Sequence, residues 1–134
     1  MGSLSGVDRL LTQARLLLRR VDALQAKKIH DDGGLLIDIR PAAQRAEFGG
    51  IPDALVVERN NLEWRLDPQG SHRLPDAADP GRPVVIICQE GYASSLAAAS
   101  LLSLGRTSVT DLDGGFVAWR QAGLPTTPGA RASS

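Results

Sequence analysis

The chain has 134 residues, of which 43% are hydrophobic and 22% charged, values typical of a single globular domain. Fifteen basic residues balance fifteen acidic ones, so no net charge favours nucleic acid or an acidic membrane surface as a partner. No apolar run approaches the roughly 18 residues of a membrane span, and arginines interrupt what would be the apolar core of a secretory signal. We therefore predict a protein with neither a nucleic-acid nor a membrane partner.

Cysteine and histidine are scarce. The one cysteine, Cys88, cannot form an internal disulfide, a pattern that suits the reducing cytosol, and we predict a cytoplasmic location. The two histidines, His30 and His72, are distant in sequence, and the chain has no CxxC or HExxH motif. These residues do not form a metal-ligand pattern, so we predict no metal site.

The N-terminal segment has the periodicity of a helix. Apolar residues recur at helical spacing and predict a helix over Val7–Leu17, and the preceding string SGVD has the form of a capping box with Ser5 as N-cap. The string DALQ repeats that form and predicts a second helix over Ala23–Asp31. A short strand at Arg19–Val21 would join the two; a single bent helix is the alternative. We expect the apolar stripe of the first helix to be buried against the domain or a neighbour, because an exposed stripe favours association.

After residue 33 short apolar strands alternate with helices. The runs LLIDI and PVVIIC are typical of parallel strands buried on both faces, and ALVVE and SVTDL are weaker strands of the same kind. This alternation predicts an α/β sheet covered on both faces. The helices between these strands are predicted over Ala42–Phe48, Asn60–Leu66, Ser94–Leu104 and Phe116–Ala122.

The string CQEGYAS connects the strand that ends at Cys88 to the next helix. Ligands of α/β sheets bind beyond the carboxyl ends of the strands, where this string lies. If the loop curls around the sulfur, its backbone N–H groups and the helix dipole favour the thiolate, which is the nucleophilic form. Gly91 provides the φ freedom that such a loop needs. The alternative is a buried structural cysteine at a strand end.

Four motifs, in order, resemble those of the rhodanese sulfurtransferases. The loop after Cys88 is similar to their C-x-x-G-x loop before a helix, and LLIDIR looks like their strand ending in Asp-x-Arg. The string EFGGIPDALVV is similar to their Glu-Phe-x-x-Gly-His-Ile-Pro-Gly-Ala segment, with Gly50 in place of His and Asp53 in place of Gly. The string LDGGFVAWRQAGLP resembles their closing Gly-Gly-x-x-x-Trp turn and helix.

The resemblance covers about residues 19–125 and implies a fold. The expected architecture is a three-layer α/β fold with a five-stranded, mainly parallel sheet in the order 1-5-4-2-3, helices on both faces and an extra N-terminal helix. The chain would then divide into a helical extension over residues 1–18, a rhodanese-like domain over 19–125 and a disordered tail over 126–134.

The resemblance also implies a reaction. Cys88 would take a sulfane sulfur from a donor such as thiosulfate or a persulfide and become a persulfide. The sulfur would then pass to a thiophilic acceptor, such as cyanide, a small thiol or a protein thiol. This chemistry needs neither a metal nor an organic cofactor. The loop residues expected to bind substrate around the catalytic Cys88 are Gln89, Glu90, Gly91, Tyr92, Ala93 and Ser94.

The loop departs from the family pattern because it contains no cation. Many rhodaneses carry an arginine or lysine at the positions of Glu90 and Ala93. Glu90 would oppose an anionic donor such as thiosulfate by like-charge repulsion. The string ERNNLEWRL follows the third strand and therefore also lies at the carboxyl side of the sheet. It offers Arg59 and Arg65 as candidate cations, and Arg59 is included among the predicted substrate-binding residues.

Other polar residues have structural interpretations. Asp38 and Arg40 resemble an ion-pair brace at a strand end, with Glu47 one helix later. Trp64 is interpreted as a packing residue, with a place in the wall of the pocket as the alternative. Ser94 is interpreted as a cap of the helix after the cysteine loop, with donation to a persulfide as the alternative.

Two other functions compete with sulfur transfer. Related phosphatases use the same cysteine-loop-helix design, but they need a loop one residue longer, with an arginine that closes on the phosphate. A rhodanese-fold binding module with a silent or redox-sensing cysteine is the second alternative. Formation of a Cys88 persulfide would distinguish these functions.

Overall fold

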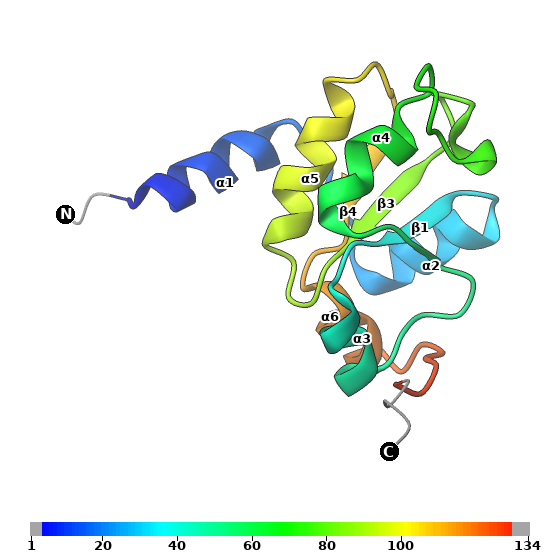
Figure 1. The fold of residues 1–134 in the computed structure, drawn as a ribbon. Helices are drawn as coiled ribbons and strands as arrows, with labels where there is room; N and C mark the ends of the chain where they lie inside the picture. The colour runs from blue at the N-terminus through cyan, green and yellow to red at the C-terminus, as the bar shows by residue number, and fades with distance from the viewer. Residues whose placement is uncertain (1–3, 130–134) are drawn as a thin grey trace.

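A parallel sheet forms the centre of the computed structural model, which describes residues 4–129 (Figure 1). Within these residues the sheet has four strands in the lateral order β2-β1-β3-β4, and each neighbouring pair is parallel. The strands are β1 (Leu35–Asp38), β2 (Leu55–Val56), β3 (Val84–Ile87) and β4 (Val109–Asp111). The carboxyl ends of all four strands therefore meet at one edge of the fold.

The predicted five-stranded sheet is wrong in its first strand. In the segment Arg19–Val21 only Val21 joins the sheet, as an isolated parallel bridge. Its N–H donates to the carbonyl of Asp111 at 3.2 Å, and its carbonyl accepts from the N–H of Asp113 at 2.9 Å. The ladder stops there because the next residue, Asp22, is already the N-cap of a helix. The four strands that form keep the relative order that was predicted for them.

Helices cover both faces of the sheet and contribute to its two hydrophobic clusters. Residues of α4 and α5 join the cluster on one face, and residues of α2 and α6 join the cluster on the other. The helices, with two 3-10 turns, are α1 (Gly6–Leu16), α2 (Ala23–Asp31), α3 (Ala42–Phe48), η1 (Arg59–Asn61), α4 (Leu62–Leu66), η2 (Pro75–Ala77), α5 (Ala93–Leu102) and α6 (Gly115–Gln121). The predicted α/β layering is thus observed.

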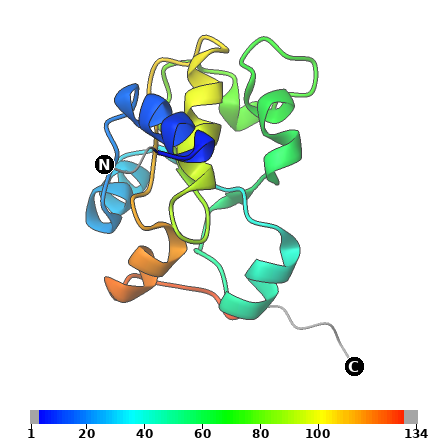
Figure 2. The same cartoon turned by 90° about the vertical axis from the view of Figure 1, so that its left-hand side faces the viewer.

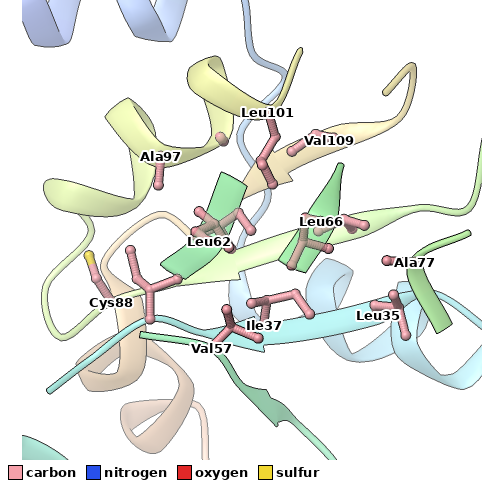
Figure 3. Close-up of a cluster of buried hydrophobic side chains, with 14 residues drawn as sticks. Leu35, Ile37, Val57, Leu62, Leu66, Ala77, Cys88, Ala97, Leu101 and Val109 are labelled. Atoms are coloured by element: carbon pink, nitrogen blue, oxygen red, sulfur yellow. The ribbon is translucent and has the colours of Figure 1, made fainter. Parts of the chain in front are cut away.

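The alternation of side chains along the strands divides the core into these two clusters. Leu35 and Ile37 of β1 point to the α4 and α5 face, whereas Leu36 points to the α2 and α6 face. Figure 3 shows the first cluster, with Cys88 at the end from which the chain turns toward α5. The cysteine therefore lies at the edge of a buried hydrophobic cluster.

The first helix forms as predicted, with Ser5 as its N-cap, but its apolar stripe is mostly uncovered. Its C-terminal part packs against α5 and buries Ala14, whereas Val7 and Leu10 are 58% and 52% exposed. The helix reaches outward beyond α5 (Figures 1 and 2), so its first turns extend past the surface that could cover them. The expected burial of the whole stripe against the domain is wrong; burial against a neighbour stays a prediction.

The segment after α6 returns along the edge of the fold. Thr127 pairs with Gly50 in an antiparallel bridge beside α3. Residues 130–134 of the predicted tail lie outside the described residues, and the division of the chain at residues 18 and 125 stays a prediction. No helix within residues 4–129 has the length and apolar character of a bilayer span.

Candidate functional site

Cys88 follows β3 directly and lies at the carboxyl end of the sheet. Its sulfur is held by backbone donors: the N–H of Gly91 lies 3.1 Å from Sγ and the N–H of Ser94 lies 3.3 Å away. The strand ends at Ile87, one residue earlier than predicted, and the loop curls around the sulfur. Two N–H dipoles directed at one atom favour negative charge on that atom, as in a thiolate.

The start of α5 is organised by a buried carboxylate. The hydroxyl groups of Ser94 and Ser95 donate to Oδ2 of Asp111 at 2.7 and 2.8 Å. The predicted capping role of Ser94 is therefore wrong: the N-cap of α5 is Tyr92, without a side-chain cap. Because the hydroxyl of Ser94 is bound to Asp111, its backbone N–H is the group that faces the sulfur.

The glycine pair in the string LDGG supports the same loop from the other side. Gly115 has φ +61°, and a Cβ at this position would lie 2.4 Å from the carbonyl oxygen of Cys88. The next two N–H groups, of Phe116 and Val117, donate to the carbonyls of Cys88 and Gln89 at 2.9 and 3.2 Å. Glycine is needed here because α6 begins directly against the loop backbone.

A pocket of about 290 Å³ opens in front of Cys88. Its lining residues are Ile39, Arg40, Pro41, Gln44, Arg59, Cys88, Gln89, Glu90, Tyr92 and Ala93. Six of the eight predicted site residues are in this set, and the other two, Gly91 and Ser94, contact the sulfur through their backbone N–H groups. The structure therefore brings all the predicted site residues together in the Cys88 pocket or in the backbone that contacts the sulfur.

Of the two candidate cations, only Arg59 reaches this pocket. It pairs with Glu63 at 2.9 Å, one helical turn later. Burial tends to raise the pKa of Glu63, but hydrogen bonds from Ser100 and Arg59 outweigh it and lower that pKa below its ordinary value. The charge of Arg59 is therefore balanced by a carboxylate. Arg65 instead donates to the carbonyl of His72 at 2.7 Å and lines a different pocket.

Exposed side chains occupy the rim of the Cys88 pocket. Glu90 is exposed, and Tyr92 is 61% exposed. Trp64 is 62% exposed and lies outside the Cys88 pocket, so its predicted packing role is wrong. The reason is its position on α4, a helix of five residues that buries Leu62 and Leu66 and leaves the side of Trp64 to solvent.

The buried ion pair links β1 to the cysteine loop. Arg40, which is 1% exposed, binds the carboxylate of Asp38 with Nε and Nη2, which confirms the predicted brace. Its Nη1 donates to Oε1 of Gln89 at 2.9 Å, and its Nη2 donates to the carbonyl of Gly49 at 2.7 Å. Glu47 is exposed and does not join the pair. Arg40 therefore orients a side chain of the loop as well as bracing the strand.

Three charged residues that hold the Cys88 loop were missed by the sequence analysis. Asp111 is fully buried and accepts from Nε of Arg20 at 3.0 Å, and Arg15 donates from α1 to the loop. Burial opposes the charge of Arg20, but the hydrogen bond and charge of Asp111 outweigh it and raise the pKa of Arg20. The available signal was the acidic residue inside the apolar run SVTDL, since buried carboxylates need a partner. Within residues 4–129 no group of three His, Cys, Asp or Glu side chains is placed to hold a metal ion.

Comparisons with known proteins agree with this geometry. A family model described as "Rhodanese-like domain" matches residues 22–122. A sulfurtransferase of Allochromatium vinosum is 36% identical over 104 residues, covering 78% of this chain and 88% of that protein. The thiosulfate sulfurtransferase GlpE of Pseudomonas savastanoi is 31% identical over 102 residues, covering 76% and 87%. A solved structure from Rhodopseudomonas palustris, described as a protein of unknown function and "Possible Tyrosine Phosphatase", has a TM-score of 0.82 at 29% identity. It covers 94% of this chain and 97% of that one.

Proposed function

Because the chain belongs to the family of rhodanese-like domains, we propose that it is a sulfurtransferase that carries a sulfane sulfur as a persulfide on Cys88. The observation that supports this proposal best is the position of the Cys88 sulfur. It faces a pocket and accepts two backbone hydrogen bonds at 3.1 and 3.3 Å. A structural cysteine needs no such donors.

The proposed first half-reaction forms the persulfide. The Cys88 thiol releases its proton to solvent, and the thiolate attacks the sulfane sulfur of the donor. The donor's S–S bond breaks, and the leaving group (sulfite in the case of thiosulfate) departs with the bonding electrons. The new negative charge rests on the outer sulfur of the persulfide, which is bonded to the Sγ that the N–H groups of Gly91 and Ser94 contact.

The second half-reaction regenerates the cysteine. A nucleophilic acceptor attacks the outer sulfur, the Cys88 S–S bond breaks, and its electrons return to Cys88 as a thiolate. Cyanide would leave as thiocyanate, and a small or protein thiol would leave as a persulfide after losing its own proton. Every electron pair is accounted for by the donor and acceptor, so the cycle requires no added oxidant or cofactor.

The donor is proposed to be thiosulfate-like or a low-molecular-weight persulfide. Relatives named as thiosulfate sulfurtransferases support the first class. The side chains of this pocket support the second, because Arg59 is paired with Glu63 and Glu90 adds a negative charge. If the loop side chains set the preference, thiosulfate should be the poorer donor. The proposed location of this chemistry, the cytoplasm, stays a prediction.

Intact-protein mass spectrometry tests the proposal. Incubation with thiosulfate or a small persulfide should add about 32 Da, the mass of one sulfur, to the chain, and cyanide should remove it as thiocyanate. Cys88→Ser is the matched control and should gain nothing. If neither donor gives the adduct, the protein is a binding or redox-sensing module instead. Hydrolysis of p-nitrophenyl phosphate that depends on Cys88 would favour the phosphatase alternative.

A further inference from the structure

The carbonyl of Gly91 is bound by two guanidinium groups from the N-terminal segment. Nη2 of Arg15 lies 2.9 Å and Nη2 of Arg20 lies 2.8 Å from this oxygen, across 76 and 71 residues of sequence. Both arginines precede residues 22–122, the part of the chain that matches the family. The same residue, Gly91, donates its N–H to the Cys88 sulfur. One loop residue therefore connects the sulfur to the N-terminal segment.

Each of the two arginines makes further contacts that fix its position. Nε of Arg15 donates to the Ser95 hydroxyl at 3.0 Å, and its guanidinium carbon lies 5.8 Å from the centre of the Tyr92 ring. Arg20 binds Asp111 with Nε at 3.0 Å and Nη2 at 3.1 Å. Asp111 in turn holds the first turn of α5. The two arginines thus fasten the loop and the helix that follows it to one network.

This anchoring fixes the direction of a peptide group. The bond between Gly91 and Tyr92 is planar and trans, so its carbonyl and N–H point in opposite directions. Holding the carbonyl toward the arginines turns the N–H of Tyr92 away from them. The position must be glycine, since φ is +91° and a Cβ would lie 3.2 Å from Nη2 of Arg20 and 2.7 Å from the backbone nitrogen of Gly114.

The charges of the two arginines are not equivalent. Arg20 is balanced by Asp111 and lies 3.2 Å from a second carboxylate, that of Asp113. Arg15 has no carboxylate within 4.0 Å among residues 4–129, and its partners are a hydroxyl, a carbonyl and a ring. Arg15 therefore adds an unbalanced positive charge next to a loop whose own side chains contain no cation and one anion, Glu90.

We propose that Arg15 and Arg20 are positioning residues of the Cys88 loop, with different roles. Arg20 fixes the shape of the loop, and Arg15 supplies from α1 the positive charge that the loop itself lacks, which favours anionic reagents at Cys88. The inference deepens the proposed function and rests on it for the identity of the donors. The reactivity of Cys88 toward alkylating reagents can be measured without sulfur transfer. The inference and the proposed function can therefore be refuted separately.

Alkylation of the full chain tests the role of Arg15. Cys88 is the only cysteine, so the reaction reports on this site alone. Iodoacetate and iodoacetamide differ mainly in charge, and the ratio of their rate constants reports the local potential. Arg15→Gln should lower this ratio about three- to fivefold at low ionic strength and less at high salt. Arg15→Lys should largely retain it, because the charge is kept.

The matched control is Arg19→Gln, which removes the same charge from an exposed neighbouring residue. Equal ratios in Arg15→Gln and Arg19→Gln would overturn the role of Arg15. A lowered ratio in a chain that forms no persulfide with any donor would support the inference while refuting the proposed function. If the persulfide forms, kcat/KM for thiosulfate should fall in Arg15→Gln and stay unchanged in Arg19→Gln.

Hydrogen exchange tests the role of Arg20. Arg20→Lys keeps a charge beside Asp111 but loses the planar fork that reaches both Asp111 and Gly91. Amide exchange in residues 88–94 should become about tenfold faster than in Arg19→Gln, with little change in β1. Unchanged exchange in the loop would overturn this role. If Arg20→Lys does not fold, Arg15→Gln removes one of the two bonds to Gly91 and should speed loop exchange to a smaller degree.

Discussion

The two ends of the parallel sheet each contain a buried arginine, and the two are satisfied in different ways. Arg40, at the carboxyl ends, is 1% exposed and binds the carboxylate of Asp38. Arg106, at the amino ends, is 2% exposed and donates to main-chain carbonyls instead. These carbonyls belong to Leu66, Ala77, Asp79 and Arg82. Burial lowers the pKa of Arg106, and the charge of Asp79 opposes that effect only in part.

The difference separates two uses of a buried cation. At the amino ends, Arg106 holds the long polar segment between α4 and β3 in place, and its Nε has no hydrogen-bond partner among residues 4–129. At the carboxyl ends, the charge of Arg40 is neutralised and its remaining N–H orients Gln89 in the Cys88 loop. A paired arginine can therefore direct a neighbouring side chain without adding a net charge to the loop.

Cys88→Ser should produce the largest effect on activity and the smallest on folding. Sulfur transfer should fall to the uncatalysed rate, because a hydroxyl is not a nucleophile at its free pKa. Stability to denaturant should change by less than about 1 kcal/mol, since the side chains are nearly isosteric. Thiocyanate formation and urea unfolding measure the two quantities. Sulfur transfer above the uncatalysed rate in Cys88→Ser would refute the mechanism.

Arg40→Met and Arg106→Met test the comparison of the two ends directly. Arg40→Met leaves the Asp38 carboxylate buried without its cation and should destabilise the protein by about 3–5 kcal/mol. Arg106→Met leaves only neutral carbonyls without their donor and should lower the free energy of unfolding by about 1–3 kcal/mol. Urea unfolding provides both values. The double variant Asp38→Leu/Arg40→Met is the control and should recover much of the loss. An equal or larger cost for Arg106→Met would contradict the distinction.

Gly91→Val and Gly123→Val separate backbone strain from loss of the site. Both residues have positive φ, so backbone strain alone should cost each substitution about 1–2 kcal/mol of stability. Among residues 4–129, a Cβ at Gly123 would meet nothing within 4 Å, whereas one at Gly91 would collide with the backbone of Gly114. We expect sulfur transfer to fall about tenfold or more in Gly91→Val alone. Equal rates in the two variants would mean that the loop tolerates a different shape.

Glu90→Lys should have the smallest effect, confined to the rim of the site. Reversing this exposed charge should raise kcat/KM for thiosulfate about three- to tenfold at low ionic strength, through attraction of the anion. Glu47→Lys makes the same change of net charge on α3, outside the pocket, and is the matched control. If the rate is unchanged in Glu90→Lys, the preference for donors must come from Arg59 or from the N-terminal arginines.

The local elements of this fold could be predicted well because their signals are local. The capping motifs at Ser5 and Asp22 mark the starts of α1 and α2, and the apolar runs mark all four strands. The Cys88 loop could be placed at a strand end for the same reason. The predicted strand at Arg19–Val21 could not be judged in this way, because its length depends on how far it pairs with the segment after β4 before the cap at Asp22 ends that pairing.

The sequence by itself determined the kind of site: a lone cysteine between a buried strand and a helix, followed by a loop whose backbone can surround it. Only the tertiary structure determined which side chains hold that loop in place. The contacts of Arg15 and Arg20 with Gly91 span more than seventy residues, and no periodicity or motif relates these positions. The direction of a long side chain depends on which carbonyl or carboxylate the folded chain brings within hydrogen-bond distance. For Arg20 that group is Asp111, whose strand lies beside the N-terminal segment only after the sheet has assembled.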